Sequence, residues 1–188
     1  MKRRSRLKLL EQHQILALIG IFTAGKTKIG SRLAADLGWT FVDIDDCIVR
    51  EFGAKDLQSV VNALTLKEFA ALEERVALET LEGVSSQTII GTGGSIIYYR
   101  KVMRALRKLA YVIHLNPSLE AVKRRVARHP DRGIVFLPGQ TVDDVYNYRL
   151  PEYPKWADET IDTSHDRPGI AKALAVRIRR HDLSGLAM

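Results

Sequence analysis

The sequence predicts an α/β domain with a mostly parallel sheet, and three observations support this class. Short apolar runs alternate along the chain with amphipathic helical segments, which is the pattern of strand–helix–strand units. A loop containing glycine follows the first apolar run and leads directly into a helix. The chain has 188 residues, 46% hydrophobic and 27% charged, so it fits one globular domain and not a disordered chain.

Four strands and four helices are expected from the apolar pattern. The continuous apolar run at residues 15–21 is typical of a strand buried on both faces, and further strands are expected at 39–44, 88–90 and 111–115. Helices are expected at 28–37, which Gly38 would end, at 57–81, at 101–109 and after Asn116-Pro117. Residues 130–141 hold two prolines and two glycines and are expected to form a loop.

Composition excludes several classes of protein. Lys and Arg number 29 against 22 Asp and Glu, a formal charge of +7, but the basic clusters fall on expected helices without zinc-ligand spacing or an aromatic RNA-binding signature. We therefore expect no nucleic-acid partner, and an anionic nucleotide accounts for part of the charge. The single cysteine, Cys47, cannot form an intrachain disulfide and points to a reducing compartment.

No membrane span is expected, because the longest apolar run is far too short to cross a bilayer. Basic residues before residue 9 followed by this run imitate a signal peptide. A polar stretch at residues 11–14 separates the two, and the run leads into a motif that the mature protein has to keep. We therefore expect a cytoplasmic protein.

Residues 20–27, GIFTAGKT, match the phosphate-binding pattern G-x-x-x-x-G-K-S/T. In this pattern the backbone N–H groups surround phosphates, Lys26 reaches the β and γ oxygens, and the Thr27 hydroxyl binds Mg²⁺. The alternative is a chance glycine turn, which the strand before it and the helix after it disfavour. ATP and Mg²⁺ are thus the expected cofactors, and the residues expected to bind them are Gly20, Thr23, Ala24, Gly25, Lys26, Thr27 and Lys28.

Two carboxylates, Asp43 and Asp45, stand two residues apart at the end of the second expected strand. Strand periodicity places both on one face, and parallel sheets bind ligands beyond the carboxyl ends of their strands. The pair could hold Mg²⁺ through water and orient an attacking hydroxyl. The alternative is that Asp45 and Asp46 cap the next helix.

The ordered motifs resemble those of the shikimate kinase family over residues 14–181. They are the phosphate loop at 20–27, VDIDD at 42–46, GTGGS at 91–95, DRGI at 131–134, RLPEY at 149–153, and DT…RPG ending at Gly169. The resemblance implies a three-layer P-loop kinase fold with a central five-stranded parallel sheet and a lid loop. It also implies one domain at residues 15–181, between a basic extension at 1–14 and a tail at 182–188, and we expect a monomer.

In that family, ATP phosphorylates a hydroxyl of shikimate, and the resemblance carries roles to this chain. Asp43 would hold the metal, Asp45 would bind the acceptor hydroxyl as the candidate base, and Lys26 and Arg132 would act on the transferring phosphate. Arg149 would bind the acceptor carboxylate beside the turn formed by Gly93 and Gly94. Adenine would lie between Arg167-Pro168 and an arginine of the preceding helix, Arg128 or Arg125.

The departures from the family pattern lie mostly on the acceptor side. The family segment reads F-x-x-x-G-E-x-x-F-R-x-x-E; here Phe69 and Glu73 match its end, but Ala70 occupies the arginine position. Lys67, one helical turn earlier, could reach the same side, and Ser95 replaces a glycine. The expected acceptor is therefore shikimate or a similar small hydroxylated carboxylate. The alternative is a non-catalytic ligand-binding domain, regulatory or degenerate.

Overall fold

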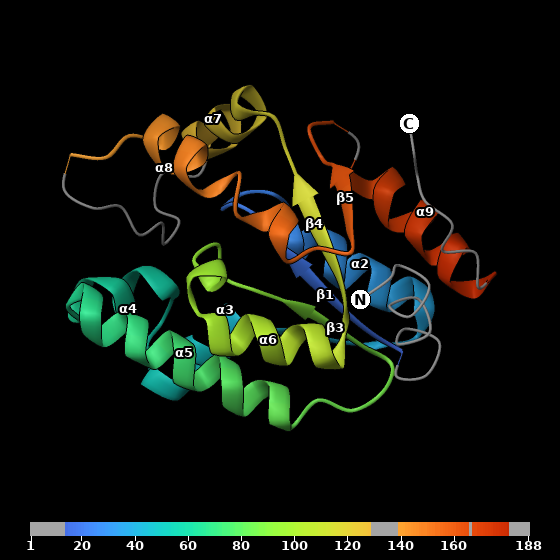
Figure 1. Ribbon diagram of the computed structural model, residues 1–188, viewed down its shortest axis with the longest axis horizontal. Coiled ribbons are helices and arrows are strands. Elements are labelled where there is room, and N and C mark those ends of the chain that lie inside the picture. Colours follow the sequence, from blue (N-terminus) through green and yellow to red (C-terminus); the bar gives the residue numbers. More distant parts are fainter. Residues whose placement is uncertain (1–13, 129–138, 166, 181–188) are drawn as a thin grey trace.

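A five-stranded parallel sheet forms the centre of the computed structural model, which describes residues 14–128, 139–165 and 167–180 (Figure 1). The strands are β1 (Ile15–Ile19), β2 (Thr40–Asp43), β3 (Thr88–Gly91), β4 (Tyr111–Asn116) and β5 (Glu159–Asp162). They are arranged in the order β2-β3-β1-β4-β5, and every neighbouring pair is parallel. The predicted α/β class with a parallel sheet is confirmed.

The central strand, β1, is buried over its whole length. Its Leu16 is in register with Ile89 of β3 on one side and with Tyr111 of β4 on the other. A strand covered on both faces has no solvent side, so its sequence is continuously apolar. Because the chain moves to opposite sides of β1 for β3 and β4, the loop that follows β1 opens into a crevice where ligands bind in such sheets.

Helices lie on both sides of the sheet (Figure 1). In the figure α5 and α6 run side by side on one side, while α2 packs against α9. The described helices are α2 (Lys26–Leu37), α3 (Ile44–Phe52), α4 (Leu57–Ala63), α5 (Leu66–Glu82), α6 (Arg100–Leu109), α7 (Leu119–Arg128), α8 (Val142–Arg149) and α9 (Arg167–Arg179), with short 3-10 turns η1 (Ile96–Tyr98) and η2 (Tyr153–Lys155).

The expected helix over 57–81 is wrong as a single element, because the chain breaks it into α4 and α5. Thr65 begins α5 with a capping box: its hydroxyl accepts from the N–H of Glu68 at 3.3 Å, and the Glu68 carboxylate accepts from the N–H of Thr65 at 2.8 Å. The apolar stripe continues across the break and so hides it. Strand β5 was not expected from the apolar pattern either, because Ile161 is its one buried residue.

The second strand ends one residue earlier than expected, at Asp43. The Asp43 carboxylate accepts a hydrogen bond from the N–H of Asp45 at 3.1 Å and caps α3. The alternative that Asp45 and Asp46 are the capping residues is therefore wrong, since both lie in the first turn of that helix.

Several expectations fall on parts of the chain outside the described residues. They concern most of the basic extension at 1–14, most of the loop at 130–141 with its Arg132, and the tail at 182–188. Within the described residues, no helix has the length and apolar character needed to cross a bilayer.

The pH dependence of stability tests the burial of His114 in β4. This side chain is 1% exposed and stacks on Tyr153 with ring centres 4.9 Å apart, and burial lowers the pKa of His114 to about 4. The unfolded chain therefore binds a proton that the folded chain rejects between about pH 6.5 and 4, so stability falls as the pH drops through this window. The loss is roughly 3 kcal/mol.

We expect His114→Phe, which keeps an aromatic ring on Tyr153, to remove this part of the pH dependence in urea unfolding measured from pH 7 to pH 4. The exposed His165→Phe is the control and should follow the parent protein. Parallel pH curves for the parent and His114→Phe would show that His114 is not the group responsible.

Candidate active site

The loop after β1 wraps around the ammonium group of Lys26. The Nζ atom donates to the carbonyls of Gly20 at 2.7 Å and Ile21 at 3.0 Å. At Gly20, φ is +150°, and a Cβ atom would lie 2.4 Å from the backbone oxygen of Leu115, so only glycine fits. Gly25 then begins α2 with φ of +104°. The loop thus joins a buried cation to the positive end of a helix, an arrangement that binds phosphates.

Thr23 has an unusual backbone and an unpaired hydroxyl. Its φ is +58°, a left-handed conformation that is unfavourable for a β-branched residue. The side chain is buried, and its Oγ1 has no hydrogen-bond partner within the described structure. Ala24, beside it, is also buried, whereas Lys28 is exposed in the first turn of α2. The loop therefore contains one hydroxyl donor with its hydrogen-bonding capacity unused.

Arg125 of α7 connects this loop to the segment after β5. Its guanidinium donates to the carbonyl of Thr23 at 3.1 Å, and to those of Thr163 at 2.5 Å and Ser164 at 3.2 Å. Arg125 is buried, whereas Arg128 is exposed at the end of the same helix. Of the two arginines that the sequence left open for the adenine side, Arg125 is thus the one that contacts the phosphate loop.

The Thr27 hydroxyl donates to Oδ2 of Asp43 at 2.7 Å, and this bond joins the start of α2 to the end of β2. Both groups are hard oxygen ligands. Mg²⁺ is usually held by one or two such protein ligands together with substrate phosphates and water, so the pair fits this ion.

Asp45 and Glu73 face the same point of the turn after β3. A Cβ atom at Gly93 would lie 2.4 Å from Oε1 of Glu73 and 3.0 Å from Oδ1 of Asp45, so a side chain there would collide with both carboxylates. Burial of the Asp45 carboxylate, together with the charges of Asp43 and Glu73, raises the pKa of Asp45 to about 7. A carboxylate with such a pKa can accept a proton near neutral pH.

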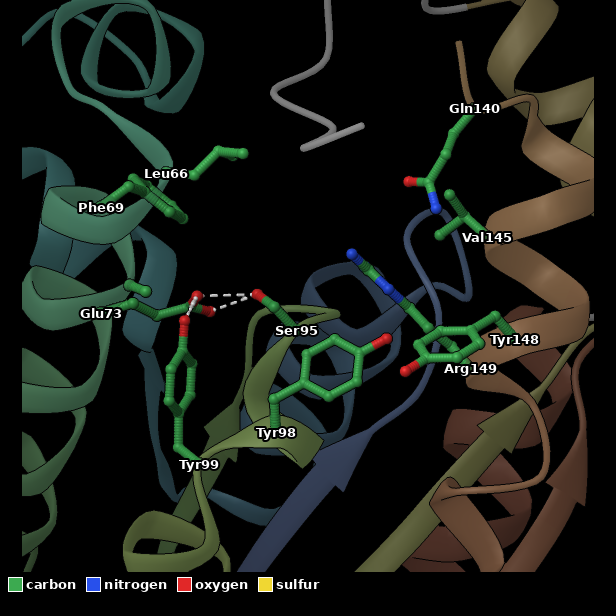
Figure 2. Close-up of a pocket in the computed structure, with 11 residues that line it drawn as sticks. Leu66, Phe69, Glu73, Ser95, Tyr98, Tyr99, Gln140, Val145, Tyr148 and Arg149 are labelled. Carbon is green, nitrogen blue, oxygen red and sulfur yellow. Dashed lines mark hydrogen bonds between the residues drawn. The ribbon is translucent and has the colours of Figure 1, made fainter. Parts of the chain in front are cut away.

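Two hydroxyl groups of the chain itself bind the buried Glu73 (Figure 2). The Ser95 Oγ lies 2.7 Å from both carboxylate oxygens, and the Tyr99 hydroxyl donates to Oε2 at 2.8 Å. Burial raises the pKa of Glu73, and these two bonds with the charges of Arg149 and Lys26 oppose the shift. The resemblance matched Glu73 without giving it a role, and the sequence reasoning missed Tyr99, although an aromatic pair four residues after Gly94 is a visible signal.

A cavity of about 250 Å³ opens beside these carboxylates (Figure 2). Its walls come from α5, η1 and α8, and they are mainly apolar and aromatic. The lining residues are Leu66, Phe69, Ala70, Glu73, Ser95, Tyr98, Tyr99, Gln140, Val145, Tyr148 and Arg149. Lys67 does not line the cavity and is exposed on α5. Within the described chain, the cation of this lining is Arg149.

Arg149 lies between the cavity and the glycine turn. Its guanidinium carbon is 5.6 Å from the ring centre of Tyr98, and a Cβ atom at Gly94 would lie 3.5 Å from its Nη1 and 3.1 Å from the backbone N of Phe22. The buried Tyr153 donates to the carbonyl of Gly94 at 2.7 Å and fixes the turn. The phosphate loop, the turn and the cavity are therefore neighbouring parts of one site.

The predicted site residues fall into two groups. The structure brings together Lys26, Thr27, Asp43, Asp45, Gly93, Gly94 and Arg149 around the phosphate loop and the turn after β3. Arg128 and Pro168 are exposed, and Arg167 is the first residue of α9. Arg132 lies outside the described residues, so its predicted role stays a prediction.

The comparisons with known proteins agree with this geometry. The family model described as shikimate kinase matches residues 22–179. The shikimate kinase of Xanthomonas campestris is 32% identical over 165 residues, covering 86% of this chain and 89% of the relative. That of Stenotrophomonas maltophilia is 31% identical over 176 residues, covering 90% and 96%.

Solved structures show the same arrangement of the chain. Shikimate kinase from Acinetobacter baumannii, in complex with shikimate, superposes with a TM-score of 0.80 at 26% identity, covering 95% of this chain and 99% of that one. The Aquifex aeolicus enzyme has a TM-score of 0.73 at 20% identity and shows the fold alone. The predicted three-layer P-loop kinase fold is confirmed, and the chain belongs to the shikimate kinase family of ATP-dependent small-molecule kinases.

Proposed function

We propose that this protein transfers the γ-phosphoryl group of ATP to a hydroxyl of shikimate or a similar small hydroxylated carboxylate. The observation that carries the proposal is the turn at Gly93 and Gly94. On one side this turn approaches the phosphate loop at Phe22, and on the other it approaches Asp45 and Arg149. A donor phosphate in the loop and an acceptor beside the turn would therefore lie next to each other, which is the main requirement for phosphoryl transfer.

The donor side stabilises negative charge. Lys26 and the N-terminal end of α2 would bind the β and γ phosphates, and the Lys26 ammonium would exchange its two carbonyl partners for phosphate oxygens. Thr27 and Asp43 would hold Mg²⁺, which neutralises phosphate charge when bound. Arg132, on the predicted lid, would close on the transferring group.

The acceptor side orients the attacking hydroxyl. Asp45 would accept a hydrogen bond and then a proton from it, because burial raises the pKa of Asp45 to about 7. Arg149 would bind the carboxylate of the acceptor through its planar guanidinium. Shikimate as a member of the acceptor class is supported by the Acinetobacter baumannii relative, whose structure is a complex with shikimate.

Other parts of the proposal follow from the sequence. We infer one domain over residues 15–181, a monomeric state, a cytoplasmic location and no nucleic-acid partner. The single cysteine supports the location, the distribution of basic residues over helices supports the absence of a nucleic-acid partner, and the domain bounds and monomeric state follow from the family resemblance. The non-catalytic alternative is disfavoured, because Lys26, Thr27, Asp43 and Asp45 are retained together in one site.

Replacing Lys26 tests the proposed reaction. Lys26→Met removes the ammonium that would stabilise the transferring phosphate, so ADP release with Mg-ATP and a panel of hydroxylated carboxylates headed by shikimate should fall by at least about a hundredfold. Lys101→Met, an exposed residue of α6, is the matched control and should keep parental activity. Undiminished turnover in Lys26→Met would overturn the assignment.

The unpaired Thr23 hydroxyl is expected to donate to a phosphate of ATP. Thr23→Val keeps the branched shape but removes the donor, so KM for ATP should rise by about tenfold, the size of a hydrogen bond to a charged group. Thr23→Ser keeps the hydroxyl and should leave KM for ATP near the parental value. Equal KM values for the two variants would show that the hydroxyl does not contact the nucleotide.

Arg125 is expected to hold the phosphate loop in place. Arg125→Met leaves three carbonyl groups without their donor, so we expect the free energy of unfolding to fall by about 2–4 kcal/mol. Arg128→Met, one turn further along α7 and exposed, should unfold like the parent. Urea unfolding checks both variants. Similar stability for Arg125→Met and Arg128→Met would show that Arg125 does not hold the phosphate loop in place.

A further inference from the structure

The polar corner of the acceptor cavity contains one cationic group that can bind an anion, Arg149. Glu73 and Ser95 lie in this corner, but the Glu73 carboxylate is already bound by Ser95 and Tyr99. The chain thus satisfies its own buried carboxylate without help from a ligand. The remaining charged group of the described lining is Arg149, whose guanidinium suits a single carboxylate.

Apart from the Gln140 amide and the tyrosine hydroxyls, the rest of the cavity lining is apolar or aromatic. Leu66 and Phe69 lie on one side and Val145 and Tyr148 on the other, with Tyr98 between them (Figure 2). Three of these side chains are exposed by large fractions: 47% for Leu66, 43% for Tyr98 and 69% for Tyr148. Ligands that cover apolar side chains gain free energy by removing them from water.

The two tyrosine rings add a preference for a planar group. The ring centres of Tyr98 and Tyr148 are 6.2 Å apart and their planes are inclined by 35°, so both rings border the same space. Such rings pack well against another flat, apolar group. An acceptor whose polar groups faced Leu66, Phe69 and Ala70 would lose hydrogen bonds to water without replacement.

The volume of the cavity limits the part of a ligand that it can enclose. Pockets for drug-sized molecules have roughly 300–1,000 Å³. The 250 Å³ of this cavity is smaller, so it suits a small ring carboxylate with a single apolar or aromatic substituent.

We propose that the acceptor of this kinase is a hydroxylated ring carboxylate that also carries an apolar or aromatic substituent, with its carboxylate on Arg149 and its substituent against Leu66, Phe69 and Tyr148. This inference rests on the proposed phosphoryl transfer at the same site. Ala70 is a specificity-determining residue in this arrangement, because its small side chain leaves the apolar wall open.

The first test compares shikimate with its mono-O-methyl and mono-O-benzyl ethers, each of which keeps the carboxylate and two hydroxyls. With Mg-ATP, we expect kcat/KM for at least one ether to exceed that for shikimate by tenfold or more. Calorimetry measures the binding of the same compounds without turnover. Binding and turnover of shikimate as good as those of every ether would overturn the inference.

A pair of variants tests the position of the wall. Ala70→Arg places a second cation in the apolar wall and should reverse the preference, with shikimate favoured over the ethers. Ala71→Arg makes the same change at the next residue, which is exposed and outside the cavity lining, and should keep the parental preference. The same ratio of kcat/KM values in both variants would show that Ala70 does not border the bound acceptor.

The two measurements also separate this inference from the proposed function. Tighter binding of an ether without ADP release on any acceptor would support the cavity assignment and overturn the phosphoryl transfer. Turnover of shikimate alone would support the transfer and overturn the cavity assignment.

Discussion

Burial of β1 between β3 and β4 is the constraint on which the rest of this structure depends. All five residues of the strand are buried, and both edges are hydrogen-bonded to parallel neighbours. The strand therefore cannot shift without exposing apolar surface and breaking two ladders at once. The carboxyl end of β1 is fixed as a result, so the phosphate loop that begins there starts from a rigid position on the sheet.

This rigidity allows the site to hold groups that are unfavourable in isolation. The loop contains Thr23 in a left-handed conformation, and the ammonium of Lys26 is buried against carbonyl oxygens. Nearby, Asp45 and Glu73 approach each other across Gly93. Such strain and desolvation persist only where the surrounding packing determines the conformation, and they concentrate at sites that bind and react.

Buried charge is balanced differently on the two sides of the site. On the donor side, the Lys26 ammonium binds backbone carbonyl oxygens. Phosphate oxygens can replace them, because a cation binds a charged oxygen more strongly than a neutral carbonyl. On the acceptor side, Glu73 receives hydroxyl donors from Ser95 and Tyr99, and the charges of Arg149 and Lys26 add to this stabilisation. The acceptor cavity can then be lined by apolar side chains, with Arg149 as the cation of its described lining.

The local pattern of the sequence by itself determined the α/β class, the phosphate loop and the place of Asp43 at the end of the second strand. These features depend on contacts between near neighbours or on periodicity, which a linear chain records directly. The apolar pattern did not predict the break at Thr65 or the short strand β5. A capping box is formed by polar residues, and this edge strand has one buried residue, so neither produces a clear apolar pattern.

Only the tertiary structure decided which distant side chains share a partner. The pairing of Glu73 with Ser95 and Tyr99, and the bonds from Arg125 to the phosphate loop, join elements separated by 22 to 102 residues. The same is true of the cavity between α5, η1 and α8, whose aromatic lining has no common spacing in the sequence. Such contacts follow from how the helices pack on the sheet, and packing is a property of the folded chain as a whole.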